Sequence, residues 1–202
     1  MKYLLLILPV IVIFSSCKKT KITSVNTNNS VDSLTYQPSV AGSKWTYQLI
    51  VSGIPTSTYN TTCTEKDSVI NAKTYKVFNS DNDGLQFFRR NGDEYYTVLT
   101  TSTNKTELLV LDASKNINDT WVGGVNGSDT YTYTLTEKHP TFALDGFNFK
   151  NVLVVHQVRK DGGGNTTLEA DTWYAQGIGQ IKSEGTLLGN SLVAKLIAVE
   201  LK

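Results

Sequence analysis

Cysteine, histidine and proline are scarce in this sequence. Two cysteines, two histidines and four prolines are spread over 202 residues. A zinc site needs three or four ligands close together, and His139 and His156 stand apart with no carboxylate cluster beside them. We therefore expect no metal site and no cofactor.

An excess of charge of either sign is also lacking. The chain has 19 Lys and Arg against 18 Asp and Glu, a formal net charge of +1. Binding to nucleic acid depends on a basic surface that neutralises phosphates. The charge balance therefore argues against a nucleic-acid partner.

Motifs of catalysis are missing as well. The sequence has no Gly-x-Ser-x-Gly elbow, no phosphate-binding loop and no His-Glu-x-x-His helix. The segment Asp81-Asn-Asp-Gly84 resembles the start of a calcium loop, but it lacks the closing glutamate and the flanking helices, so we interpret it as a hairpin turn. We expect no enzyme activity.

The two histidines have ordinary structural interpretations. His139 precedes Pro140 and is predicted to lie in a solvated turn. His156 falls within an apolar run and should share one strand face with Val154 and Val158. A lone histidine there is more often a hydrogen-bonded core or rim residue than a base or a ligand. A buried carboxylate beside His156 in a cleft would instead favour a hydrolase.

The single long apolar run covers residues 3–14. As a helix it would be about 18 Å long, well short of the ~30 Å hydrocarbon core of a bilayer. Residues 1–16 are therefore predicted to be a signal peptide. Ser15 and Ser16 before Cys17 match the lipobox of bacterial lipoproteins, although Phe14 stands where that pattern prefers leucine. The match implies acylation of Cys17, palmitate included; the alternative is an ordinary secretory signal with an incidental cysteine.

Residues 17–38 are rich in Thr, Asn, Ser and Lys and show no sustained periodicity. Such a segment cannot bury enough apolar surface to offset its ordering entropy. We expect it to be a flexible tether, with the membrane as partner through the lipid on Cys17. Cys63 then has no partner for a disulfide and is predicted to pack as a small side chain.

The rest of the chain, residues 39–202, has the pattern of β-strands. Trp45, Tyr47 and Leu49 alternate with polar neighbours, and so do Tyr131 and Tyr133, as in half-buried antiparallel strands. Asn-Gly and Asp-Gly pairs near residues 83, 91, 126 and 161 predict hairpin turns. We predict strands over residues 44–52, 57–67, 73–79, 85–90, 94–101, 105–112, 129–138, 149–160, 166–175, 178–184 and 191–201.

These strands predict one all-β domain. Many short antiparallel strands without a convincing amphipathic helix indicate a sandwich or a half-open barrel of about 10–11 strands. Strand order and the choice between sandwich and barrel are not fixed by the pattern.

Four segments carry a resemblance to a known group of proteins: Gly42-Ser-Lys-Trp-Thr-Tyr47, Asn118-Asp-Thr-Trp121, Gly146-Phe-Asn-Phe-Lys-Asn-Val152 and Trp173-Tyr-Ala-Gln-Gly-Ile-Gly-Gln-Ile-Lys182. In this order they resemble uncharacterised β-rich lipoproteins of the Bacteroidetes type, which have no established activity. Asn118 stands where that group would have a glycine. The resemblance implies export and lipid anchoring. The absence of an acidic run after Cys17 favours the periplasmic face of the outer membrane over the cell surface.

Candidate site residues are mainly aromatic. The first interpretation of the tryptophans is core packing with each indole N–H bonded to backbone. The alternative is a ligand surface that stacks sugars or holds acyl chains, made of Trp45, Tyr47, Trp121, Tyr131, Tyr133 and Trp173. The tripeptides that begin Asp32-Ser33 and Asp67-Ser68 are similar to O-glycan acceptors of that bacterial group, which implies candidate glycosylation at Ser33 and Ser68.

Three functions follow as hypotheses. The first is a non-catalytic binding or accessory module of the cell envelope that contacts a glycan, a peptide or an envelope protein. The second is a carrier of acyl chains in a half-open barrel, by analogy of fold. The third and least favoured is a hydrolase. The sequence fixes neither the ligand nor the oligomeric state.

Overall fold

Twelve antiparallel strands form in the part of the chain that the structure describes. The computed structural model describes residues 34–101, 104–187 and 189–202. The strands are β1 (Lys44–Val51), β2 (Ile54–Ile70), β3 (Lys73–Ser80), β4 (Gly84–Asn91), β5 (Glu94–Thr100), β6 (Lys105–Asp112), β7 (Thr120–Asn126), β8 (Asp129–Leu144), β9 (Phe147–Lys160), β10 (Thr166–Ala175), β11 (Gly179–Leu187) and β12 (Asn190–Glu200). No helix among these residues is long and apolar enough to cross a bilayer.

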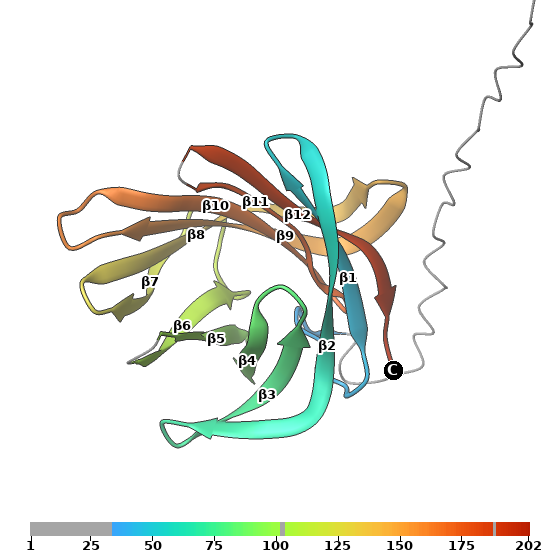
Figure 1. The fold of residues 1–202 in the computed structure, drawn as a ribbon, viewed down its shortest axis with the longest axis horizontal. Helices are drawn as coiled ribbons and strands as arrows, with labels where there is room; N and C mark the ends of the chain where they lie inside the picture. Colours follow the sequence, from blue (N-terminus) through green and yellow to red (C-terminus); the bar gives the residue numbers. More distant parts are fainter. Residues whose placement is uncertain (1–33, 102–103, 188) are drawn as a thin grey trace, which may run out of the picture.

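The strands make one sheet that curves into a nearly closed barrel (Figure 1). Its order is β6-β5-β4-β3-β2-β1-β12-β11-β10-β9-β8-β7, so strands that follow each other in the chain pair with each other except β6 and β7, and β1 pairs with β12. The all-β prediction is confirmed, and the continuous sheet decides for a barrel over a sandwich. Hairpin turns lie at the predicted Asn-Gly and Asp-Gly positions, and the final segment is a strand as expected.

Strand β7 is absent from the eleven strands predicted above. Its centre, Gly123-Gly124, has the composition of a turn, and a bulge between Val122 and Gly124 interrupts its alternation. Nearby, Asn118 has φ of 73°, a left-handed conformation that glycine adopts freely and asparagine tolerates. Asparagine therefore performs the backbone role of the glycine expected at this position.

The two ends of the sheet, β6 and β7, meet at a seam without a backbone ladder. Side chains bridge it: the Trp121 indole N–H donates to the Leu109 carbonyl oxygen at 2.9 Å, and the Thr106 hydroxyl bonds the Asn126 side-chain oxygen at 3.0 Å. A Cβ at Gly123 would lie 2.7 Å from the Leu109 carbonyl oxygen and 2.3 Å from the Tyr133 ring. Glycine at this position therefore lets the two edges approach each other.

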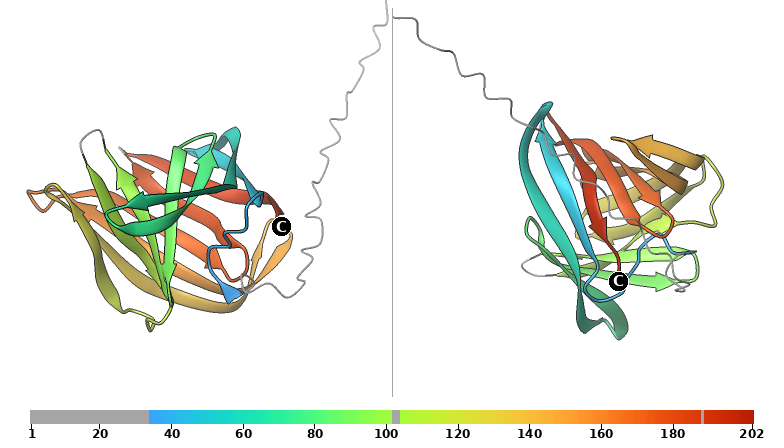
Figure 2. Two further views of the ribbon diagram at one scale, coloured as in Figure 1. Left: turned by 90° about the horizontal axis from the view of Figure 1, so that it is seen from below. Right: turned by 90° about the vertical axis from the view of Figure 1, so that its right-hand side faces the viewer.

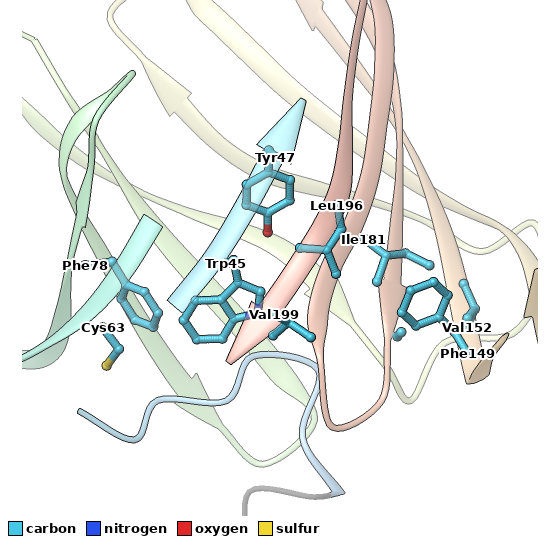
Figure 3. Close-up of a cluster of buried hydrophobic side chains, with 10 residues drawn as sticks. Trp45, Tyr47, Cys63, Phe78, Phe149, Val152, Ile181, Leu196 and Val199 are labelled. Atoms are coloured by element: carbon cyan, nitrogen blue, oxygen red, sulfur yellow. The ribbon is translucent and has the colours of Figure 1, made fainter. Parts of the chain in front are cut away.

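Two clusters of buried side chains lie inside the barrel. The first joins strands far apart in the sheet, with Phe78 of β3 and Phe149 of β9 in one cluster around Trp45 (Figure 3). The second brings Tyr95 and Leu111 against Tyr133 on the other side of the seam. Cys63 is buried in the first cluster, as the sequence predicts. Apolar side chains from both sides of the seam therefore share one interior.

Residues 34–43 cross one end of the barrel beside the C-terminus (Figure 2). Thr35 is buried, and its carbonyl oxygen accepts the Gly177 N–H at 2.7 Å. The Tyr36 N–H donates to the Tyr95 hydroxyl at 3.1 Å. Residues 34–38, assigned to the tether from composition, thus include residues that hydrogen-bond to the barrel.

Replacing Gly123 by alanine should weaken the seam. The added Cβ overlaps the Tyr133 ring and the Leu109 carbonyl oxygen, and overpacking of this kind costs about 1–3 kcal/mol. Urea unfolding monitored by tryptophan fluorescence would measure the loss, with Val122→Ala as the matched control because Val122 is 61% exposed. Equal stability of G123A and the wild type would mean that the edges do not approach as closely as described.

Candidate functional site

Most of the predicted aromatic surface points into the barrel. Trp45, Tyr47, Tyr131 and Tyr133 are at most 7% exposed. The Trp45 indole N–H donates to the Ile178 carbonyl oxygen at 2.6 Å, and the Tyr47 hydroxyl donates to the Gln180 carbonyl oxygen at 2.9 Å. Burial raises the pKa of Tyr47 and Tyr133 far above the usual tyrosine value, so both hydroxyls stay neutral. These contacts match the core-packing interpretation.

Trp121 and Trp173 are half-buried and pack against different clusters of the barrel. Trp121 stacks on Tyr133 with ring centroids 5.9 Å apart and belongs to the seam. Trp173 is half-buried on the outer face of β10, with the Lys182 ammonium 4.2 Å from its ring centroid and the Phe142 ring 6.5 Å away. The six aromatic residues therefore do not form one surface, and whether any of them contacts a ligand stays a prediction.

A different feature lies on the outer face of β9–β12. Two adjoining hollows of about 260 Å³ and 530 Å³ share Glu169 and Thr186, and we call them together the outer groove. The smaller hollow is lined mainly by polar atoms and the larger one mainly by apolar atoms. Together the lining comprises His156, Thr166, Thr167, Leu168, Glu169, Ala170, Asp171, Glu184, Gly185, Thr186, Gly189 and Ser191. Carboxylates and hydroxyls there can accept and donate hydrogen bonds to a polar ligand.

His156 and Asp171 form a pair within the outer groove. They are direct partners in the β9–β10 ladder, and the imidazole Nδ1 lies 2.9 Å from the Asp171 carboxylate. This is the carboxylate beside His156 that would favour a hydrolase, but it is not buried: the two side chains are 33% and 38% exposed. The sequence alone could not predict this pairing, because the pairing depends on the register between β9 and β10.

Carboxylates face each other across the next ladder. Asp171 of β10 lies opposite Glu184 of β11, an arrangement of like charges that weakens a sheet. Lys182 partly relieves it through an ion pair of 2.6 Å with Glu184. The sheet therefore keeps acidic side chains in the groove at some cost to its stability.

The remaining predicted positions have plain surroundings. His139 lies within β8 and contacts Glu137 and the Phe142 ring, so the predicted turn is wrong; Pro140 does not end the strand, because β8 runs on to Leu144. Ser68 is half-buried in β2, opposite Tyr75. Cys17 and Ser33 lie outside the described residues. Within the described residues no three His, Cys, Asp or Glu side chains gather as metal ligands.

A second polar cluster, which the sequence did not reveal, lies on the outer face of β3–β6. Glu107 accepts hydrogen bonds from Lys73, from the Tyr75 hydroxyl at 2.6 Å and from Arg89 at 2.8 and 2.9 Å. Burial alone would raise the pKa of Glu107, but the three donors outweigh it and hold the pKa below its usual value of 4.5. Lys73 and Arg89 both pair with the Glu107 carboxylate, so the cluster stabilises the sheet.

Comparison with solved structures shows the fold. An inferred exported protein from Bacteroides fragilis with a YmcC-like fold is 12% identical, with a TM-score of 0.51 over 81% of this chain and 98% of that chain. An inferred lipoprotein from Parabacteroides distasonis is 10% identical, with a TM-score of 0.49 over 82% of this chain and 98% of that one. No protein-family model matches the chain, and no curated protein matches it significantly. The first of these structures shows that the barrel occurs in another chain of very different sequence.

Substituting Glu107 by glutamine should give a pH-dependent loss of stability. Because folding lowers the pKa of Glu107, its contribution is complete above the unfolded value near 4.5 and is lost as the pH falls through the folded value. At pH 7 we expect E107Q to lose about 1.5–3 kcal/mol, typical of a hydrogen bond to a charged group. Urea titrations from pH 7 to pH 3 would measure a gap between the two proteins that narrows below about pH 4.5. A gap independent of pH would contradict this role, and the exposed Glu65→Gln is the control.

Proposed function

We propose that the protein is exported and anchored by lipid on Cys17 to the bacterial outer membrane, facing the periplasm. The apolar run of residues 3–14 and the Ser15-Ser16-Cys17 sequence support this placement. The shared fold with an inferred exported protein is consistent with it. Two or three acyl chains on one cysteine give stable membrane binding, whereas one chain gives only marginal binding.

Acylation can be tested by metabolic labelling with radioactive palmitate in a Gram-negative host. The full-length protein should take up label and sediment with outer membranes. Cys17→Ala should abolish labelling, while Cys63→Ala should leave it unchanged. Label retained in C17A, or a wild-type protein without label, would overturn the anchoring proposal.

We also propose that the protein is a non-catalytic module that binds a glycan in the outer groove. The observation that supports this best is the contrast between the two sides of the sheet. Inside, aromatic side chains from widely separated strands pack together, whereas a carrier of acyl chains needs an apolar cavity. Outside, the open hollow is lined by carboxylates and hydroxyls.

A glycan fits the chemistry of the groove better than an acyl chain. Glu169, Asp171 and Glu184 present acceptors on two neighbouring strands, and Thr166, Thr186 and Ser191 add hydroxyls that both donate and accept. Sugar hydroxyls can donate to these carboxylates and also exchange hydrogen bonds with the Thr and Ser hydroxyls. Trp173 is not part of the groove lining, and the Lys182 ammonium lies over its ring.

Binding can be measured on an array of bacterial envelope polysaccharides with the full-length protein in neutral detergent. Asp171→Asn and Glu169→Gln should each weaken binding to the best polysaccharide about tenfold, the effect of losing one hydrogen bond to a charged group. Glu65→Gln changes an exposed carboxylate outside the groove and should bind like the wild type. Binding unaffected by both groove variants would exclude the groove. An acyl lipid released from the purified protein in native mass spectrometry would favour the carrier instead.

A further inference from the structure

A third hollow lies at the end of the barrel that residues 34–40 cross. We call it the strap pocket; it has a volume of about 150 Å³ and is lined by Gln37, Ser39, Thr74, Lys76, Phe88, Arg89, Arg90, Tyr95 and Tyr96. Three of these side chains are cations and none is a carboxylate. The chain as a whole is balanced, with 19 basic and 18 acidic residues, whereas the lining of the pocket is basic through Lys76 and Arg90, with Arg89 paired to Glu107.

Strand register explains why these groups converge. Lys76 lies opposite Phe88 in the β3–β4 ladder, and Arg90 lies opposite Tyr95 in the β4–β5 ladder. Because side chains alternate along a strand, the four share one face of the sheet. Arg89, one residue earlier, points to the other face, where it bonds Glu107.

The N-terminal segment supplies the opposite wall. The Tyr36 N–H donates to the Tyr95 hydroxyl, and the Tyr36 ring meets the Tyr95 ring edge-on with centroids 6.1 Å apart. These contacts hold Gln37 and Ser39 over the basic side chains. The pocket therefore exists only while residues 34–40 lie against the barrel.

Arg90 has N–H groups available to bind a ligand. Its Nε–H donates to the Gly92 carbonyl oxygen at 2.7 Å, and the guanidinium carbon lies 5.6 Å from the Tyr95 ring centroid. These contacts orient the planar group, while the terminal nitrogens donate to no other residue in the part of the chain that the structure describes. A guanidinium held in this way is suited to bidentate binding of an oxyanion.

Lys76 is the second cation that a ligand can engage. Its ammonium pairs with Asp67 at 2.7 Å, but both side chains are nearly half exposed, and exposed pairs contribute little. Burial and the nearby Tyr95 and Asp93 raise the pKa of Tyr36. Glu107 lies on the other face of the sheet, where it pairs with Arg89. No carboxylate lines the strap pocket itself, and a doubly charged anion can replace Asp67 as the partner of Lys76.

We propose that the strap pocket binds a phosphate group. Arg90 would hold two of its oxygens and Lys76 a third, with the Thr74 hydroxyl and the Gln37 amide as further donors. A phospholipid headgroup and a soluble phosphate ester share this chemistry. Either would fasten residues 34–40 to the barrel, independently of any ligand in the outer groove.

The test is thermal unfolding of the full-length protein in neutral detergent, at constant ionic strength set with chloride. The probes are inorganic phosphate and, separately, dihexanoylphosphatidic acid below its micelle concentration. We expect the Tm to rise with phosphate and to level off at saturation. Arg90→Gln and Lys76→Gln should each raise the apparent Kd about tenfold or more. Lys138→Gln, which removes an exposed cation from another part of the barrel, should leave the Kd unchanged.

Each outcome is decisive. Saturation by both probes supports recognition of the phosphate group itself, and saturation by the lipid alone supports a membrane headgroup as its source. No stabilisation by either probe overturns the proposal, as does equal binding by wild type, R90Q and K76Q. If R90Q unfolds, Arg90→Lys keeps the charge without the bidentate fork and should still weaken phosphate binding.

Discussion

The pairing of β1 with β12 is the contact on which the barrel depends. It joins the first strand to the last, with Trp45 opposite Val199 and Tyr47 opposite Leu196, and the other ladders connect strands that are neighbours in the chain. Bringing such distant segments together has a high loop-closure entropy cost. Trp45 adds to the gain that offsets it, because its indole is buried in the largest cluster and bonds the turn between β10 and β11.

The closure also determines which side chains are buried and which face outward, where they can contact a ligand. With one side of the sheet turned inward, aromatic residues such as Trp45, Tyr47 and Tyr133 become core, and polar side chains of the same strands are left on the outside. Tyr133 and His156 illustrate the division: Tyr133 stacks on Trp121 inside, whereas His156 faces Asp171 on the outer face. The strap pocket forms where this arrangement ends, at the rim that residues 34–40 cover.

Much of the fold could be predicted from local signals. Alternation in β1 and β8 and the Asn-Gly turns are short-range properties, so the strands around Tyr47 and Tyr131 were correctly placed. Strand β7 was missed because Gly123 reads as a turn residue, while its real role is a close approach that exists only after closure. The groove and the strap pocket could not be predicted, because each combines residues from three or more segments whose register the sequence does not reveal.

The ring topology has a consequence for the order of events in folding. A chain delivered from its N-terminus can build β1–β6 and then β7–β11 as successive hairpins, but β1 keeps an unpaired edge until residues 190–200 arrive. Until that moment the interior stays open and Trp45 lacks its partners from β12. A barrel of this kind therefore remains incomplete during synthesis and closes only when β12 is available to pair with β1.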